Sequence, residues 1–455
     1  MSRQVAIRLR RVAICCAVAA MALFASARTR PHYGGTLRVE IEGDPWQRPG
    51  GLARRIVLDG LTAMSLDGTV RPALAVEWKP ENDDHRWQFR LRSGVHFHDG
   101  TAVNSANVVA SLTAICGSGC PWTAIHAVGS SVVFTSDSAL PNLPELLSGD
   151  EYRIALQGSE NAAIHESIGT GAFQFTGTSK GVVTLTANDN CWQGRPFLDA
   201  IEIYTHRSIH DQWLDLSVGK ADLVEVRAEQ FRQAHEQRLT VIASPPVSLL
   251  AITVSDSGAL ANPSLRASIA LAVDRSALFN VIFQKQGEIT GSLLPAEITG
   301  YSFLFTTDRD LNKAHELHGG ATASGLTIAA EGGPVMQLAA QRIALNLRDA
   351  GFNAQVVAAN VPQHIDLRLR LLPLESKQPQ AGMESIVRAA GLAIPVVGQT
   401  PVGLYKFERE VLDARMIIPL LYLPRAYAVG GRVRDLRLGP DGAPELAGAS
   451  LEDGQ

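Results

Sequence analysis

The sequence predicts an α/β protein of two lobes between which the chain passes more than once. Three observations support this fold class. Predicted strands and helices alternate along most of the chain, as they do when helices pack on the faces of a sheet. The 455 residues exceed what one hydrophobic core usually covers, roughly 250–300 residues. Two apolar runs, Val247–Val254 and Met416–Tyr422, have the composition of buried strands and would carry the chain to the second lobe and back.

The first residues have the composition of a secretory signal. Four arginines precede the apolar run Val12–Phe24, and Ala25-Ser26-Ala27 follows it as a cleavage site. We expect cleavage after Ala27, so that residues 1–27 are a signal peptide and the mature chain is periplasmic. The apolar run is shorter than the roughly 20 residues of a spanning helix. Arg28 and Arg30 resist export, which leaves a membrane-anchored form open as the alternative.

The overall charge limits the kinds of partner. The chain carries 41 Lys and Arg against 45 Asp and Glu, a net charge of -4, and it is more negative without the four arginines of the predicted signal. Nucleic-acid binding needs a basic face, so this mild acidity argues against a nucleic-acid partner. It suits a soluble exported protein, which we expect to be a monomer.

Three cysteines follow the predicted cleavage site. An oxidising compartment permits Cys116 and Cys120 to form a disulfide around the short loop between them, and the alternative is that both are small buried residues. A metal site at this pair is disfavoured because no His pair at zinc-finger spacing follows. Cys191 is expected to be a packing residue rather than a reactive thiol.

One stretch of the first half combines strand, turn and helix signals. Residues 86–91 (RWQFRL) alternate apolar and polar side chains, the pattern of a half-buried strand. Residues 95–97 resume the alternation and predict a second short strand, which an Asp-Gly turn ends. Asn104 then stands at the N-cap position of a helix, because apolar residues follow it at helical spacing.

The same reasoning predicts the other elements. Helices are expected where apolar residues recur at helical spacing, and strands where apolar runs are bounded by Gly, Pro or Asn. In chain order these are a strand at 36–41, a helix at 52–61, a strand pair within 122–147, strands at 173–175 and 182–187, a helix and strand within 211–224, helices at 262–284, 310–318 and 334–350, and a strand at 354–357. The tail 439–455 is rich in Gly, Pro and Ala and is predicted to be loose.

Several of these segments also resemble a known family in their amino-acid sequence and in their order along the chain. Residues 72–112 contain PALAVEW, LRSGVHFHDGTAV and VVASL, and residues 169–173 read GTGAF. Residues 188–203 read NDNCWQGRPFLDAIEI, and residues 291–301 read GSLLPAEITGY. These motifs are similar to those of the family 5 extracellular solute-binding proteins, the dipeptide- and oligopeptide-binding components of ABC importers. The resemblance is close over residues 34–320 and loose over 321–455.

The resemblance implies both a fold and a function. The fold would be the two-lobed, type II periplasmic-binding-protein-like α/β fold. Lobe I would comprise residues 34–246 and 417–455, with an extra subdomain at about 72–168, and lobe II would comprise 247–416. The protein would capture peptides or a related small solute between its lobes and pass it to ABC importer permease subunits, without a cofactor. The alternative is a sensory or regulatory binding protein with a degenerate or non-peptide cleft.

The resemblance places the loop after the first strand at the mouth of the ligand cleft. Trp46 would offer a stacking surface there, and Glu42 or Asp44 would supply a negative charge for an ammonium group. The other interpretation is that Asp44 and the proline after it merely form a turn.

A departure from the family pattern adds two further candidates. The stretch 363–373 (QHIDLRLRLLP) keeps an aspartate, Asp366, but lacks the Trp and the Asp-Pro whose aspartate pairs with a peptide N-terminus in the family. Arg368, Arg370 and Glu375 are present instead. A ligand without an α-ammonium group, or one bound through Arg368 or Arg370, is therefore an open possibility.

Catalytic and metal-binding patterns are weak. His96 and His98 share a strand face, and His206 and His210 would share a helix face, so both pairs are conceivable metal ligands. A polar strand face and a turn explain the first pair more simply, and no third ligand is evident near the second. The sequence has no G-x-S-x-G elbow and no phosphate-binding loop. We therefore expect no enzyme activity, no catalytic residue and no metal site.

Overall fold

The computed structural model describes residues 31–47, 50–116, 119–156, 168–300, 305–320, 325–361, 364–374, 378–393 and 400–452. The predicted signal peptide lies outside these ranges. Within them, no helix combines the length and the apolar character that crossing a bilayer requires.

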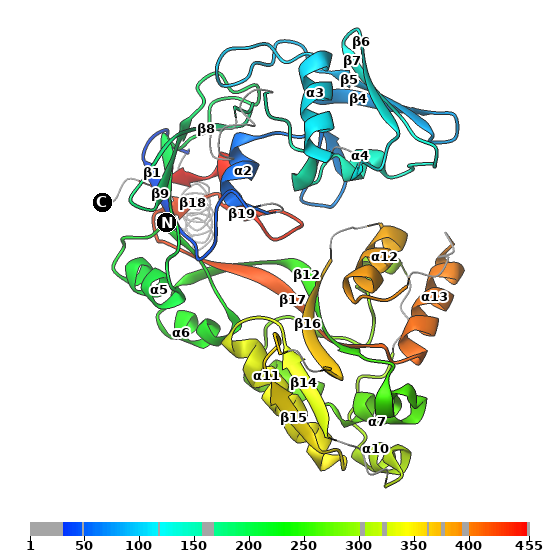
Figure 1. The fold of residues 1–455 in the computed structure, drawn as a ribbon. Coiled ribbons are helices and arrows are strands. Elements are labelled where there is room, and N and C mark those ends of the chain that lie inside the picture. The colour runs from blue at the N-terminus through cyan, green and yellow to red at the C-terminus, as the bar shows by residue number, and fades with distance from the viewer. Residues whose placement is uncertain are drawn as a thin grey trace, which may run out of the picture.

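One mixed sheet of eleven strands runs through both lobes (Figure 1). Its strands are β1 (Thr36–Glu40), β8 (Phe173–Ser179), β9 (Val182–Ala187), β10 (Ala200–Tyr204), β11 (Leu223–Glu225), β12 (Thr240–Val254), β13 (Glu288–Ile289), β14 (Leu326–Ala330), β15 (Ala354–Val357), β16 (Leu367–Pro373) and β17 (Ile417–Val429). Their order is β15-β14-β16-β12-β17-β11-β1-β10-β9-β8, with β13 also paired to β17. The long antiparallel strands β12 and β17 lie at the middle and connect the lobes, which confirms the two-lobed α/β fold.

The first lobe forms around the parallel strands β1, β10 and β11, whose carboxyl ends therefore lie at one edge of the sheet. Helix α2 (Leu52–Val57) packs with Leu37 and Val39 of β1 in one apolar cluster. Helices α5 (Ile209–Ser217) and α6 (Phe231–Glu236) contribute to a second cluster that includes Val224 of β11.

A separate subdomain carries its own apolar core at the top right of Figure 1. Its elements are β2 (Thr62–Met64), β3 (Val70–Pro72), β4 (Ala75–Glu81), β5 (Arg86–Leu91), α3 (Ser105–Cys116), β6 (Ala124–Val128), β7 (Ser131–Thr135) and α4 (Leu143–Leu146). Four of the strands form a sheet in the order β4-β5-β7-β6. Phe89 of β5 is fully buried against Phe134 of β7, edge to face with 5.3 Å between ring centroids. The alternation in residues 86–91 thus predicted a buried strand face correctly.

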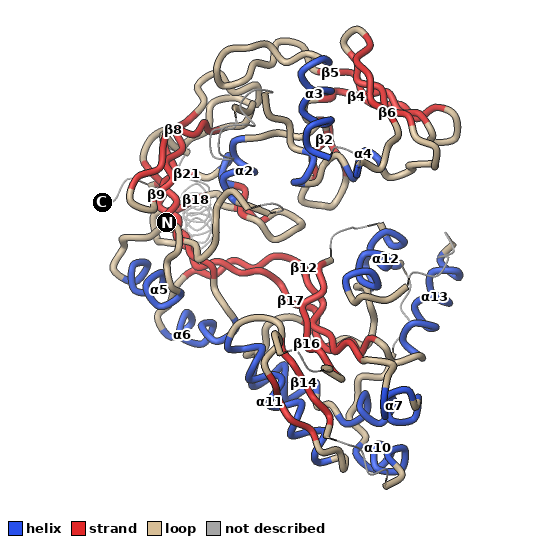
Figure 2. Tube along the Cα trace, in the orientation of Figure 1, coloured by secondary structure: helices blue, strands red, loops and turns tan. Residues whose placement is uncertain are grey.

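The second lobe packs helices on both faces of β12 and β16. Its helices are α7 (Pro263–Ala272), α8 (Arg275–Ala277), α9 (Ala296–Thr299), α10 (Leu311–His318), α11 (Pro334–Asp349), α12 (Pro379–Ala389) and α13 (Pro401–Asp413). Leu250 and Ile252 of β12 lie in the cluster with α7 and α11, whereas Leu249 and Ala251 lie in the cluster with α12 and α13. Figure 2 shows the strands of this lobe with helices around them. The exact lobe boundaries, 246/247 and 416/417, fall near or within these long strands and stay a prediction.

The crossover strand β12 is longer than the sequence predicts. It begins at Thr240, seven residues before the expected start, although Pro245 and Pro246 lack the N–H that a sheet uses. Register shifts against β17 fall between Ala243 and Pro246 and between Pro246 and Ser248. These irregularities let the strand continue past both prolines.

Two other local predictions were wrong. Residues 95–97 form no strand but only a single bridge between His96 and Ala102, although Val95 and Phe97 are buried. The helix expected over 262–284 is interrupted after Ala272, because Asp274 starts a new helical turn by accepting a hydrogen bond from the Ala277 N–H. Helical spacing of apolar residues persists across such a break, so the pattern alone does not reveal it.

Residues 439–452 of the C-terminal tail are ordered, although the tail 439–455 was predicted to be loose. They contain the short strands β20 (Pro444–Glu445) and β21 (Ser450–Leu451), which pair with β19 (Arg437–Leu438) and β18 (Val433–Arg434) just before the tail. Leu446, Ala449 and Leu451 are buried in the first-lobe core. A few spaced apolar side chains thus outweigh the Gly- and Pro-rich composition.

The cysteine predictions fare differently. Cys120 is disulfide-bonded, while its predicted pairing with Cys116 stays a prediction because the side chain of Cys116 lies outside the described part. Cys191 is a buried free thiol, and burial raises its pKa, as expected for a packing residue.

Candidate functional site

The loop after β1 contacts the segment after β11. Glu42 forms an ion pair with Arg227, and both side chains remain partly exposed. Asp44 accepts a hydrogen bond from the backbone N–H of Trp46 at 2.9 Å, the geometry of an Asx turn. Glu42 thus has a charged partner at the carboxyl edge of the first-lobe sheet, while Asp44 shapes the loop.

Trp46 lies inside the first-lobe core. Its side chain is only 3% exposed, and its ring meets that of Phe175 edge to face with 5.5 Å between centroids. This placement makes Trp46 a packing residue in the present conformation. Its role as a stacking surface for a ligand stays a prediction.

The two predicted arginines share one acid in the second lobe. Arg368 and Arg370 are two residues apart on β16 and therefore point to the same face of the sheet. Glu331, directly after β14, lies 3.5 Å from Arg368 (Oε1 to Nη1) and 2.9 Å from Arg370 (Oε2 to Nε). The parallel pairing of β14 with β16 brings these three residues together.

The two arginines differ in how firmly they are held. Arg370 also donates from Nη1 to the backbone carbonyl of Ala389 at 2.8 Å, at the end of α12. Arg368 makes only the longer contact with Glu331 among the described residues, and 38% of its side chain is exposed. Arg368 therefore keeps most of its donors available to another molecule, whereas Arg370 supports the surrounding structure.

The two lobes approach each other closely at a glycine beside these charges. Gly333 precedes α11, and a Cβ atom at this position would lie 3.1 Å from Nη1 of Arg227. The first-lobe pair Glu42–Arg227 thus lies against the start of the second-lobe helix, two residues after Glu331. We call Glu42, Arg227, Glu331, Arg368 and Arg370 the interlobe cluster.

The interlobe cluster has the position and charge of an anion-binding region. Its residues follow or lie near the carboxyl ends of parallel strands, where ligands of open α/β sheets usually bind. It holds three guanidinium groups and two carboxylates, and the positive end of the 16-residue helix α11 adjoins it. Guanidinium groups bind carboxylates through paired hydrogen bonds, so a ligand carboxylate suits this excess of positive charge.

The family-like aspartate of this region has a structural role. Asp366 accepts hydrogen bonds from the backbone N–H and the hydroxyl of Thr327, at 2.8 and 2.7 Å. It therefore ties the start of β16 to β14. Glu375, the other acid noted in the sequence, lies outside the described residues.

The contacts of His98 are structural and do not suggest a metal site. His98 accepts a hydrogen bond at Nδ1 from the Gly169 N–H (3.3 Å), and its Nε2 faces the Gly171 carbonyl at 3.1 Å. Burial lowers the pKa of His98. Within the described ranges, no group of three or more His, Cys, Asp or Glu side chains could hold a metal ion.

Sequence reasoning missed Arg227 and Glu331. Glu331 had a usable signal, because Glu-Gly-Gly-Pro between a strand and a helix marks the carboxyl end of a strand. Arg227 had none, since its importance arises only from the approach of Glu42 and Gly333. Of the predicted residues, the structure brings Arg368 and Arg370 together, links Glu42 to them through Arg227 and Gly333, and leaves Asp44 and Trp46 in local roles.

Two surface hollows share no lining residue with the interlobe cluster. One, of about 310 Å³, is lined by Arg38, Glu40, Tyr204, Arg207, Asp215 and Lys220. Burial raises the pKa of Glu40 there despite its ion pair with Arg207. Arg207 also pairs with Asp215, so these charges largely satisfy one another. The second hollow lies between α5 and α6.

Comparison with known proteins identifies a family and several relatives. The model of the bacterial extracellular solute-binding proteins, family 5 (Middle), matches residues 69–364. Protein XP55 of Streptomyces lividans is 26% identical over 282 residues, which cover 57% of this chain and 51% of that protein. The probable di/tripeptide-binding protein 5 of Pseudomonas aeruginosa (strain UCBPP-PA14) is 23% identical over 340 residues, 64% of each chain.

A shorter match involves a regulator. The HTH-type transcriptional regulator SgrR of Yersinia enterocolitica is 30% identical over 157 residues, which cover 33% of this chain and 28% of that protein. The chain thus spans about half to two thirds of the length of the first two relatives and less of the third.

Solved structures share the fold. The ABC transporter substrate-binding protein CtaP of Listeria monocytogenes aligns with a TM-score of 0.79 and 18% identity over 92% of this chain and 99% of that one. The oligopeptide-binding protein AppA of Bacillus subtilis, solved with a nonapeptide, aligns with a TM-score of 0.75 and 16% identity over 93% of this chain and all of that one. At such identities the likeness shows the fold alone.

Proposed function

Because the chain belongs to the family 5 bacterial extracellular solute-binding proteins, we propose that it captures a small solute between its two lobes and delivers it to a membrane ABC importer. The family consists of solute-binding proteins rather than enzymes, and we assign no catalytic residue. Export through the signal in residues 1–27 and action in the periplasm belong to the same proposal.

The interlobe cluster is the observation that carries this proposal. It joins charged residues of both lobes where a hinge between β12 and β17 would open and close the gap. Closure on a solute would let both lobes contribute to binding and would exclude water from the contacts.

Arg368 is the proposed ligand-binding side chain. Its single long contact and its exposure leave donors for a solute carboxylate, with Arg370 and Glu331 holding the neighbouring charges in place. Peptides, which end in a carboxylate, are the default solute class, in keeping with the name of the Pseudomonas relative. Glu42 is the candidate partner for a ligand ammonium group because its side chain stays 45% exposed beside Arg227, whereas that of Asp366 is 19% exposed and engaged by Thr327.

A sensory or regulatory binding protein is the second candidate. The match to the transcriptional regulator SgrR favours it, because a related segment occurs in a protein with a regulatory name. Permease and ATPase genes next to the gene of this chain would support the importer. A lone receptor gene in that place would support the sensor.

Mass spectrometry of small molecules released from the natively purified protein tests the solute class. We expect peptides or other small carboxylates, and a dipeptide and oligopeptide panel should raise the melting temperature, because a ligand that binds only the folded state stabilises it. If no peptide is released and no panel member changes the melting temperature, the peptide assignment fails.

Arg368→Gln tests the site itself. Loss of a hydrogen-bonded charge pair with the solute should weaken binding by about 10-fold or more, since such a bond contributes about 1.5–3 kcal/mol. The matched control is Arg409→Gln, which removes an equally charged side chain from the exposed face of α13, where it pairs with Asp413. Equal affinities of the two variants would remove Arg368 from the site.

A further inference from the structure

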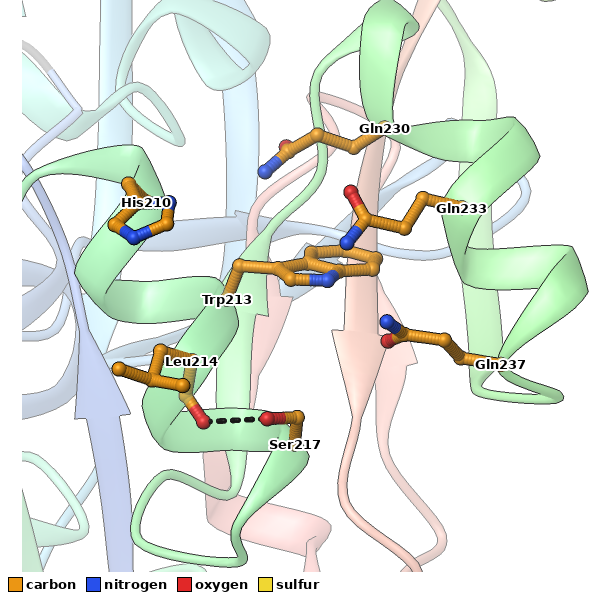
Figure 3. A pocket seen from close by; sticks show the side chains of 7 residues that line it. All are labelled: His210, Trp213, Leu214, Ser217, Gln230, Gln233 and Gln237. Atoms are coloured by element: carbon orange, nitrogen blue, oxygen red, sulfur yellow. Dashed lines mark hydrogen bonds between the residues drawn. The ribbon is translucent and has the colours of Figure 1, made fainter.

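A second hollow in the first lobe has the features of a ligand site that the proposed function does not use. It encloses about 250 Å³ and is lined by His210, Trp213, Leu214 and Ser217 of the α5 side and by Gln230, Gln233 and Gln237 of the α6 side. Figure 3 shows the Trp213 indole lying between the two segments, with the three glutamine side chains extending toward it.

Trp213 presents a buried donor without a partner. Its side chain is 6% exposed, and within the described part of the chain its indole nitrogen has no hydrogen-bond partner. In Figure 3 this nitrogen lies on the ring edge toward Gln237. A buried N–H group that stays unpaired costs about 1–3 kcal/mol, so an occupant that accepts this hydrogen bond would be favoured.

Gln230 supplies a second donor of fixed orientation. Its side chain is 8% exposed, and its Oε1 accepts the backbone N–H of Arg227 at 2.9 Å. Because the oxygen is engaged, the NH2 group is the end left for the hollow, and Figure 3 shows it directed toward the His210 side. No other hydrogen bond of this carboxamide occurs among the described residues.

The rest of the lining combines the apolar side chain of Leu214 with polar side chains, and none of these groups carries a permanent charge. Gln233 and Gln237 each offer a donor and an acceptor. Ser217 donates to the Leu214 carbonyl at 2.7 Å and so contributes at the rim rather than inside. None of the residues that line the hollow is Lys, Arg, Asp or Glu.

We infer that this hollow binds a small neutral polyol of about monosaccharide size, with ligand oxygens accepting from the Trp213 indole N–H and the Gln230 carboxamide. Hydroxyl groups both donate and accept, which matches the mixed capacity of the two other glutamines. At about 30 Å³ per water, the hollow holds about eight water molecules, which is too little for a drug-sized ligand and enough for a small one.

The test follows the indole N–H signal of Trp213 by NMR while the full-length mature protein is titrated with glucose, glycerol and myo-inositol. Trp213→Phe identifies the signal and keeps a ring in the core. We expect at least one polyol to shift this signal saturably, with a Kd of about 1 mM or tighter. Calorimetric titration, which does not need the indole signal, should show the same polyol binding Trp213→Phe about 10-fold more weakly than the parent, because one buried hydrogen bond is lost.

Two controls keep the result specific. Trp78→Phe changes a tryptophan of the subdomain, stacked on Phe89 and distant in sequence, and should leave polyol affinity unchanged. Gln233→Ala on the exposed side of the hollow should weaken binding without unfolding the protein. If none of the three polyols shifts the Trp213 signal, or if Trp213→Phe binds them as tightly as the parent, the hollow holds only solvent and the inference is wrong.

Discussion

The carboxylate of Asp222 fastens three parts of the first lobe, and replacing it by asparagine should destabilise the protein measurably. Its side chain is 3% exposed. It accepts from the backbone N–H of Arg38 at 2.9 Å and from the Arg38 guanidinium at 3.0 and 3.1 Å. The Arg432 guanidinium donates at 2.8 and 2.7 Å. One carboxylate therefore joins β1, the segment before β11 and the turn between β17 and β18.

The expected cost of Asp222→Asn is about 3 kcal/mol. Breaking a buried ion pair by removing one partner costs about 3–5 kcal/mol. The lower end applies because asparagine keeps one acceptor oxygen, and because Arg38 and Arg432 are 28% and 37% exposed, so that water screens and rehydrates them. Urea unfolding measures the change in the free energy of unfolding. Asp413→Asn, at an exposed carboxylate paired with Arg409 and Arg415, is the control and should cost about 0.5 kcal/mol or less.

The pH dependence of this difference has a definite sign. Burial raises the pKa of Asp222, but the hydrogen bonds from Arg432 and Arg38 outweigh burial and hold it below its ordinary value of 3.8. Its stabilising effect is therefore present above that value and is lost as the pH falls through the lower folded-state pKa. Parent and Asp222→Asn should converge in strong acid. A cost below 0.5 kcal/mol at neutral pH, or a difference that grows on acidification, would refute this reasoning.

Two further variants test packing within the first lobe and the contact between that lobe and the subdomain. Gly171→Ala should destabilise the protein by about 1–3 kcal/mol in thermal unfolding, because the new Cβ would lie 2.2 Å from the Ile56 carbonyl oxygen. Gly431→Ala is the control and should be neutral, because the space around the added atom is open. Equal effects of the two variants would contradict the packing argument. Stability should fall as the pH drops below about 6.5, the ordinary pKa of His98, by at most about 1.4 kcal/mol per unit from this group, because burial lowers its folded-state pKa. His98→Gln should flatten that slope, and an unchanged slope would show that another group titrates there.

Local signals predicted many elements well because they act within a few residues. Asn104 begins α3 as expected, since its side chain accepts from the Asn107 N–H at 3.0 Å. Asn262 does the same for the Ser264 N–H at the start of α7. The helix at 334–350 and the strand at 354–357 lie within one residue of their predicted bounds. Capping and periodicity are sequence-local properties, so the sequence is sufficient to reveal them.

The errors arise where long-range contacts override local composition. Proline is unfavourable in a central strand, yet β17 provides a long partner along which β12 continues with register shifts around Pro246. Leu446 and Leu451 fix the Gly-rich tail in place. Their side chains pack in a core to which strands more than 200 residues earlier contribute. Neither partner can be inferred from the segment itself.

The candidate site shows the same division. Arg368 and Arg370 stood out because they replaced an expected motif, and the structure does place them on one face of β16. Glu331 and Arg227 become relevant only through strand pairing and lobe contact, which no local pattern contains. The family resemblance gives Trp46 a stacking role at the mouth of the cleft, but packing in the core around it accounts for its presence equally well.

The most direct test of the central claim is a calorimetric titration of the solute identified by mass spectrometry into the parent protein, Arg368→Gln and Arg409→Gln. Arg368→Gln should bind the solute about 10-fold or more weakly than the other two proteins, with all three equally stable. The same affinity in all three proteins would contradict capture of the solute at the interlobe cluster.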